Sequence, residues 1–245
     1  MNKFSAIALQ KCFTDAVEKR KYNKELFSLI APKYNKATKI LSLYNDHKWK
    51  TNLINKLENL KRPICLDIAC GTGDVTFQLA QKYTGGTIYG LDITQAMIDS
   101  ANRRNIFSNI EFVCSDMCNT QFEDNFFDII TASYALRNSP DLNKTLNEIK
   151  RILKPNATLA ILDFSKVDNN FLQKLHYYIL KSWGNLWGII LHQNHTTYGY
   201  IAESLKHFPN EKEFEKLLFN YNFKIIYKKK FFFCMIKLII VKCEK

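Results

Sequence analysis

Long apolar runs are missing from this sequence, and so are the closely paired cysteines of a disulfide framework. The most apolar stretch covers eleven residues from Phe231 and contains Lys237, whereas about 20 apolar residues are needed to span a bilayer. The seven cysteines include no CxxC pair, and most lie in or beside apolar runs, where a free cysteine behaves as a small buried hydrophobe. We therefore expect a cytoplasmic protein with reduced thiols that sits at most peripherally on a membrane surface.

Candidate metal ligands are equally sparse. Cys114 and Cys118 form one pair and His192 and His195 another, and neither has a second pair at ligand spacing. The sequence therefore predicts no metal site.

Acidic residues are outnumbered, with 23 Asp and Glu against 35 Lys and Arg and a net charge of +12. Such a balance indicates either an anionic partner, nucleic acid or an acidic membrane face, or a lysine-rich surface that only keeps the chain solvated. Charge alone leaves both interpretations open. With 47% hydrophobic and 13% aromatic residues, the chain has ample material for a core, which excludes disorder.

Apolar runs alternate with amphipathic segments from residue 63 onward. We expect strands at 63–70, 87–93, 110–116, 126–136 and 157–164, and helices at 74–83, 95–105 and 142–154. This alternation predicts an α/β fold with a Rossmann-like, doubly wound and mostly parallel sheet. Two further strands after residue 222 would complete seven strands with an antiparallel C-terminal edge.

Two helical segments lie outside this alternation. Residues 1–60 contain no glycine and show helical spacing of apolar residues, and residues 166–210 combine helical character with clustered aromatics. We expect residues 1–60 to form a helical lid or extension. Residues 61–245 would form the main domain, with a helical insertion at about 166–210 that also belongs to the lid.

Only eight glycines occur in 245 residues, so the two in the stretch CGTGD at 70–74 call for an explanation. A strand, a glycine turn and a helix N-terminus form a binding corner for adenosine or phosphate. A Walker A loop needs GK[ST] after its glycines, a dinucleotide turn needs a third glycine where Thr76 stands, and Asp74 would oppose phosphate in both. A ligand with adenosine but no phosphate remains, and S-adenosylmethionine fits.

Acidic residues also end three successive predicted strands. Asp92 lies 19 residues beyond the second glycine of the turn, a spacing at which a carboxylate accepts the ribose hydroxyls. Asp116 is placed to meet the adenine amino group, with Met117 packing on the ring. The methionine moiety is expected to face Asp67 and Gly71. One acidic strand end is usually an ordinary loop residue, but this ordered set indicates a cofactor site.

Longer segments resemble one family. LDIACGTGDVT marks only a class I methyltransferase, whereas ALRN at 135–138, DFSK at 163–166 and YIAESLKHFP at 200–209 are more specific. Through these segments the chain from about residue 27 resembles the ubiquinone/menaquinone biosynthesis C-methyltransferases, the UbiE/MenG family. The resemblance implies methyl transfer from S-adenosylmethionine to a ring carbon of a prenylated quinol, either demethylmenaquinol or a methoxybenzoquinol.

The resemblance also implies roles for individual residues. Arg137 would stabilise a phenolate or position a water as proton acceptor, unless it only pairs with a nearby carboxylate. Asn138 and Tyr200 are the other implied catalytic residues, although Tyr200 could equally be aromatic core. The further cofactor-binding residues implied are Thr72, Gly73, Ile93, Met97 and Ser133. Family members often self-associate, so a homodimer is implied. The apolar segment 171–192 would line a channel for the isoprenoid tail or touch a bilayer face, unless it is a plain buried helix.

Departures from the family pattern bear on the acceptor. Asn35 stands where the family has an aspartate, Asn156 and Ala157 replace paired glycines, and residues 231–234 replace another glycine pair. They leave open a specialised homologue that methylates another small aromatic or lipid-like acceptor.

Two other functions are disfavoured. The [DNS]PP[YFW] motif that holds a base amine in many nucleic-acid methyltransferases is absent, and no RNA-binding module is visible, so we expect no nucleic-acid partner. A non-catalytic subunit of a quinone-synthesis complex would not need the complete set of cofactor residues.

Overall fold

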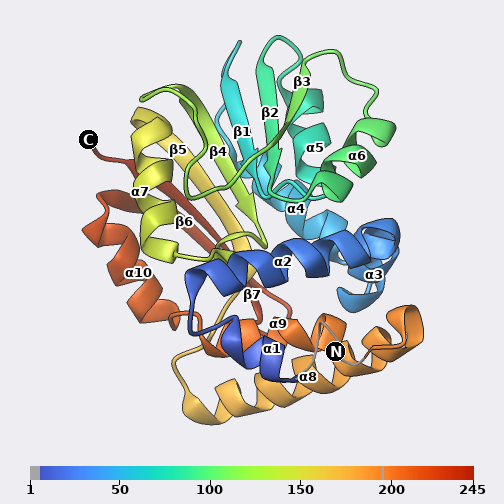
Figure 1. The fold of residues 1–245 in the computed structure, drawn as a ribbon. Coiled ribbons are helices and arrows are strands. Elements are labelled where there is room, and N and C mark those ends of the chain that lie inside the picture. The colour runs from blue at the N-terminus through green and yellow to red at the C-terminus, as the bar shows by residue number, and fades with distance from the viewer. Residues whose placement is uncertain (1–5, 195) are drawn as a thin grey trace.

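The computed structural model describes residues 6–194 and 196–245, and a seven-stranded sheet forms its centre (Figure 1). The strands are β1 (Ile64–Ile68), β2 (Thr87–Asp92), β3 (Ile110–Cys114), β4 (Phe127–Ser133), β5 (Leu153–Phe164), β6 (Phe223–Phe231) and β7 (Ile236–Cys243). Their order is β3-β2-β1-β4-β5-β7-β6. β1 to β5 pair in parallel, and β7 is antiparallel to both of its neighbours. The predicted doubly wound sheet is confirmed, with β7 inserted so that β6 forms the edge.

Helices cover both faces of the sheet because its central strands are apolar on both sides. On one face, α4 (Asp46–Lys56) and α5 (Asp74–Lys82) pack against residues such as Cys65 and Ile129. On the other face, α7 (Leu142–Ile152) and α10 (Glu211–Asn220) pack against Leu66 and Ile130. These two residues directly follow Cys65 and Ile129 in the sequence. α6 (Gln95–Arg104) lies beside β2 and β3. The alternation of neighbouring side chains between the faces fixes the strand register.

The remaining helices gather at one end of the sheet. They are α1 (Ala6–Lys11), α2 (Ala16–Ile30), α3 (Tyr34–Leu41), α8 (Asn170–His192) and α9 (Thr196–Lys206). Figure 1 shows α2 lying across this end of the sheet, with α8 and α9 beyond it. A third apolar cluster holds them together, with Leu26 and Ile30 from α2, Leu191 from α8 and Tyr198 from α9. Segments far apart in sequence therefore form one layer over the strand ends.

Helix caps explain where two of these helices begin. The Asp15 side chain accepts a hydrogen bond from the Val17 N–H at 2.8 Å, and that of Asn169 accepts one from the Leu172 N–H at 3.0 Å. α8 runs for 23 residues. Even so, no helix within residues 6–194 or 196–245 combines the length and apolar content needed to cross a membrane.

Candidate active site

The glycine turn joins β1 to α5. Gly71 and Gly73 have φ angles of +55° and +88°, in the left-handed region that residues with a Cβ rarely adopt. A Cβ on Gly73 would lie 2.8 Å from the ring of Phe77. Backbone conformation and internal packing therefore require glycine at residue 73, whereas the sequence argument considered only the close approach of a ligand.

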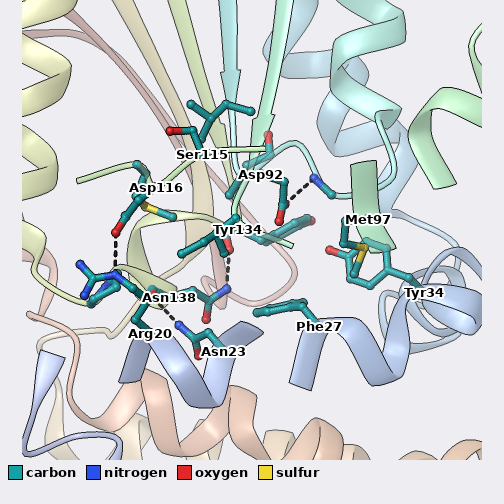
Figure 2. Close-up of a pocket in the computed structure, with 17 residues that line it drawn as sticks. Arg20, Asn23, Phe27, Tyr34, Asp92, Met97, Ser115, Asp116, Tyr134 and Asn138 are labelled. Carbon is teal, nitrogen blue, oxygen red and sulfur yellow. Dashed lines mark hydrogen bonds and ion pairs between the residues drawn. The ribbon is translucent and has the colours of Figure 1, made fainter. Parts of the chain in front are cut away.

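A pocket of about 630 Å³, the strand-end pocket, lies where β1, β2, β3 and β4 end beside this turn (Figure 2). α2 closes it on the side away from the sheet with Arg20, Asn23 and Phe27. The structure brings seven of the predicted cofactor-binding residues to its wall: Gly71, Asp92, Ile93, Met97, Asp116, Met117 and Ser133. The carboxyl ends of parallel strands are the usual place for a ligand in such a sheet.

Asp92 connects β2 to the glycine turn. Its Oδ2 accepts a hydrogen bond from the Gly71 N–H at 3.0 Å and its Oδ1 accepts one from the Thr94 N–H at 2.9 Å. Burial raises the pKa of this carboxyl, while the bonds from Thr94 and Gly71 act to lower it. Because each carboxylate oxygen can accept a second hydrogen bond, Asp92 fits a pair of ribose hydroxyls.

The carboxylate of Asp116 already accepts a hydrogen bond from a residue of α2. Its Oδ2 accepts a hydrogen bond from Arg20 Nε at 2.6 Å (Figure 2), and its Oδ1 accepts one from the Cys118 N–H at 2.9 Å. An adenine amino group would have to share these oxygens. Arg20 had no signal in the sequence, since it lies on a polar face of a helix 96 residues away.

Three other predicted cofactor-binding residues, Asp67, Thr72 and Gly73, do not line the strand-end pocket. Both Asp67 oxygens accept hydrogen bonds at 2.8 Å from hydroxyls, one of Thr76 and one of Thr131. Burial raises the pKa of Asp67 to about 6 against the lowering effect of these bonds. Thr72 is almost fully buried. These residues brace the turn from behind, where Asp67 and Thr72 border a separate, smaller hollow.

A second pocket, of about 930 Å³, lies between the sheet end and the layer of helices. We call it the aromatic pocket, because Trp49, Trp183, Tyr198, Tyr200 and Phe232 are in its mostly apolar wall. Four residues belong to the walls of both pockets, so the two meet there: Phe27, Tyr34, Tyr134 and Asn138. Tyr34 is partly buried, and burial raises its pKa to about 12.

Arg137 lines the aromatic pocket but is held by several partners. It lies in the short 3-10 helix η2 (Leu136–Asn138) after β4, and its Nη1 donates to Ser204 Oγ. Its Nε lies 3.6 Å from Asp163 Oδ1, and the guanidinium stands over the Phe164 ring at 5.1 Å. The pairing with a carboxylate that the sequence left open is therefore present.

Asn138 and Tyr200 are joined through α2. Asn23 Nδ2 donates to the Asn138 carbonyl at 2.6 Å, and the Tyr200 hydroxyl donates to Asn23 Oδ1 at 2.7 Å. Asn138 Nδ2 in turn donates to the Tyr134 carbonyl at 2.9 Å (Figure 2). This chain of bonds ties α2, η2 and α9 together where the pockets meet.

Several buried polar atoms around this junction have no hydrogen-bond partner among the described residues: Ser133 Oγ, Asn138 Oδ1 and Asp46 Oδ1. Buried polar atoms are normally paired, so such a group in one place indicates a ligand site. Ser133 lines the strand-end pocket, Asp46 the aromatic pocket and Asn138 both. Unpaired atoms in both walls fit a polar cofactor in the first pocket and a hydroxylated acceptor in the second.

Of the departures from the family pattern, one contacts the glycine turn and another lines the aromatic pocket. Asn35 Oδ1 accepts a hydrogen bond from the Thr72 hydroxyl at 2.5 Å, so this position contacts the glycine turn. Phe232 lines the aromatic pocket from a turn in which Phe232, Phe233 and Cys234 all have positive φ, from +49° to +66°. His195, considered above as a metal ligand, lies outside the described residues.

The sheet order, the glycine turn and the acidic residue after β2 together define a Rossmann-like methyltransferase fold. A crystal structure of an S-adenosylmethionine-dependent methyltransferase from Aquifex aeolicus has this fold, with a TM-score of 0.59, 17% identity and coverage of 79% of this chain and 89% of that one.

The sequence comparisons are more specific. The model of the ubiE/COQ5 methyltransferase family matches residues 14–240. A ubiquinone/menaquinone biosynthesis C-methyltransferase of Rickettsia prowazekii is 31% identical over 88% of this chain and 90% of its own length. A demethylmenaquinone methyltransferase of Chlamydia caviae is 34% identical over 86% and 91%. The chain belongs to the ubiE/COQ5 methyltransferase family, which confirms the resemblance seen in the sequence.

Proposed function

We propose that this chain transfers a methyl group from S-adenosylmethionine to a ring carbon of a prenylated quinol. The meeting of the two pockets at Tyr34, Tyr134 and Asn138 carries the proposal. One pocket has a carboxylate for a ribose, and the other is large, apolar and aromatic. A donor and a ring held in them would meet at the shared wall.

The residues of the strand-end pocket suit this cofactor. Asp92 would accept the ribose hydroxyls, and Ile93, Met97 and Met117 offer apolar surface for the adenine. Ser133 Oγ, which is buried and unpartnered, lies on the same wall. When bound, S-adenosylmethionine supplies a methyl carbon activated by its positively charged sulfur.

The chain's own contribution is to orient the ring and exclude water. The α2 side chains cover the junction, and the bonds of Asn23 to Asn138 and Tyr200 hold this cover in place. Positioning a reactant beside its partner removes much of the entropic barrier, and a dry site strengthens each polar contact. The same geometry would serve other electron-rich rings. Because Phe232 reshapes the acceptor wall, a different small aromatic or lipid-like acceptor is the second candidate.

A bilayer face is the proposed source of the prenylated acceptor. α8 exposes eight large apolar side chains: Phe171, Leu172, Leu175, Tyr178, Ile179, Leu186, Ile189 and Ile190. A contiguous apolar surface of this kind is typical of a contact site, and an interfacial helix binds lipid through its apolar face. Leu180 and Trp183 of the same helix line the aromatic pocket. A tail lying in the membrane would thus be next to the acceptor site, and the net charge of +12 favours anionic lipid.

Sedimentation with phosphatidylglycerol vesicles tests this contact. Replacing Ile189 and Ile190 together by glutamate should abolish co-sedimentation, whereas Ile106→Glu, at an even more exposed position in a loop, should not. If the purified protein instead forms dimers that the Ile189 and Ile190 changes dissociate, α8 binds a second copy and the membrane assignment is wrong.

The reaction itself is tested with labelled S-adenosylmethionine and the purified protein under reducing conditions. Demethylmenaquinol, a methoxybenzoquinol lacking the ring methyl, and total RNA are offered in parallel. Label in one quinol and none in RNA is the expected result and identifies the ring. Label in neither quinol, with the cofactor still bound in calorimetry, would rule out the quinol and direct the search to another acceptor.

A further inference from the structure

Asp46, the first residue of α4, lines the aromatic pocket and has a buried carboxylate oxygen without a hydrogen-bond partner. The residue is 5% exposed. Its Oδ2 lies 2.7 Å from Lys50 Nζ, and its backbone N–H donates to Ser42 Oγ at 3.2 Å. Oδ1 is buried and accepts no hydrogen bond from any described residue.

The groups around Asp46 come from several elements. Lys50 lies on the same helix, and its Nζ is also 3.3 Å from Oδ2 of Asp74 in α5. One lysine therefore pairs with two carboxylates. Tyr34 of α3 and Tyr134 after β4 lie on the pocket wall with Asp46. Burial, reinforced by the charge of Asp46 and by a hydrogen bond from the Tyr134 hydroxyl to this carboxylate, raises the pKa of Tyr134 well above its ordinary value. Both tyrosines therefore stay protonated at neutral pH and do not act as bases there.

Among the described residues of the aromatic pocket wall, Asp46 is the one carboxylate. The charged residues of this wall are Asp46 and Arg137, and its remaining members are apolar residues, tyrosines, hydroxyl residues and one asparagine. Arg137 is a permanent cation. Asp46 also lies close to the junction, since Tyr134 borders both pockets.

We propose that Asp46 is the catalytic base, which takes the hydroxyl proton of the acceptor through Oδ1. The inference rests on the proposed function, because it needs a phenolic ring in the aromatic pocket. While the ring carbon bonds to the methyl carbon, the methyl–sulfur bond breaks and its electron pair stays on sulfur. The hydroxyl proton passes to Oδ1, which leaves a neutral dienone in place of a cationic ring.

Two proton movements complete the reaction. The tetrahedral ring carbon loses its hydrogen as a proton to water, and the proton on Oδ1 returns to the dienone oxygen. The ring is aromatic again and Asp46 is again a carboxylate, so one proton is released for each methyl group transferred. Lys50 holds Oδ2 in place throughout.

Asp46→Asn tests this role, because it keeps the shape and removes the base. General-base catalysis contributes about 10²- to 10⁴-fold, so kcat for the quinol should fall by that range. The cofactor Kd from calorimetry and the quinol KM should change by less than about threefold. The acidic limb of the kcat/KM profile should disappear in the variant. The variant should also lose less rate with a ring-halogenated quinol, whose hydroxyl is more acidic, than with the quinol that carries no halogen.

Asp74→Asn is the matched control, since it also removes one carboxylate from Lys50 but lies outside the aromatic pocket. Its remaining activity should keep the acidic limb. If Asp46→Asn keeps the limb, or loses activity only in step with weaker cofactor binding and a lower melting temperature, Asp46 is structural and the proposal is wrong. If the unmodified protein binds cofactor but methylates no phenolic ring, the proposed function fails and the base role fails with it.

Discussion

Replacing Asp92 by alanine is the most direct test of the cofactor site. The carboxylate joins the end of β2 to the glycine turn through the N–H groups of Gly71 and Thr94, at 3.0 and 2.9 Å. It would also accept the ribose hydroxyls. The change therefore affects both cofactor binding and the turn that forms the pocket, and the two effects must be measured separately.

The magnitudes follow from the bonds that are lost. Hydrogen bonds to a charged group contribute about 1.5–3 kcal/mol each, so losing two ribose bonds should cost about 3 kcal/mol or more. That is about a 100-fold or greater increase in the cofactor Kd. The two N–H groups left without acceptors would each cost about 1–3 kcal/mol, which lowers the free energy of unfolding by about 2–6 kcal/mol.

Calorimetric titration of the folded variant measures the first effect and urea unfolding the second. Asp128→Ala is the control, because Asp128 Oδ2 accepts a bond from the Ile64 N–H at 2.8 Å at the opposite end of β1. It should lose stability and keep its cofactor affinity. A folded Asp92→Ala protein that binds S-adenosylmethionine within threefold of the unmodified protein would refute the ribose assignment.

Three further predictions concern stability. Because the folded-state pKa of Asp67 is about 6, above its ordinary value of 3.8, its charge costs stability at pH 7 and nothing below about pH 4. The free energy of unfolding, relative to Asp67→Asn, should therefore rise by about 2 kcal/mol as the pH falls from 7 to 4 in urea titrations; a fall would contradict this. Lys50→Met leaves Asp46 without its cation in a buried ion pair, while Asp74 keeps Arg104, and should destabilise by about 3–5 kcal/mol; Lys144→Ala, at an exposed pair, should cost less than about 1 kcal/mol. Phe233→Gly should raise the melting temperature, since Phe233 is 84% exposed at a φ of +53° and left-handed backbone costs about 1–2 kcal/mol. Ile106→Gly, at an exposed position without positive φ, should lower it.

The sheet could be predicted from the sequence because each of its signals is local. Apolar runs of strand length alternate with helical periodicity, and the structure has an element at every predicted position. The boundary at residue 153 was missed: the predicted helix was continued to 154, but it ends at Ile152 and β5 begins at Leu153. Leu153 pairs with Phe127 across a register shift in the ladder, and such an irregularity has no sequence signature.

The parts of the site that the sequence missed come from distant segments. Asn23 reaches Asn138 across 115 residues, and Lys50 reaches Asp74 across 24. In the sequence these residues look like ordinary polar residues of a helix. The periodicity of a helix predicts which face is buried, but it does not predict which other element a polar side chain will contact. Asp46 was overlooked for the same reason. An alignment of relatives in which these pairs vary together would have identified them.

The departures from the family pattern affect the two pockets differently. At residue 35 an amide replaces a carboxylate, but its oxygen still accepts the Thr72 hydroxyl, so the contact with the glycine turn is kept. In the segment 231–234, residues 232–234 have the positive φ angles that glycine adopts most easily. Phe232 lies in the wall of the aromatic pocket, and its ring centroid is 5.6 Å from that of Trp49. A strained backbone persists only where the surrounding structure holds it. Since that strain supports a ring on the acceptor side, we expect these departures to change which ring is methylated and not whether the cofactor binds.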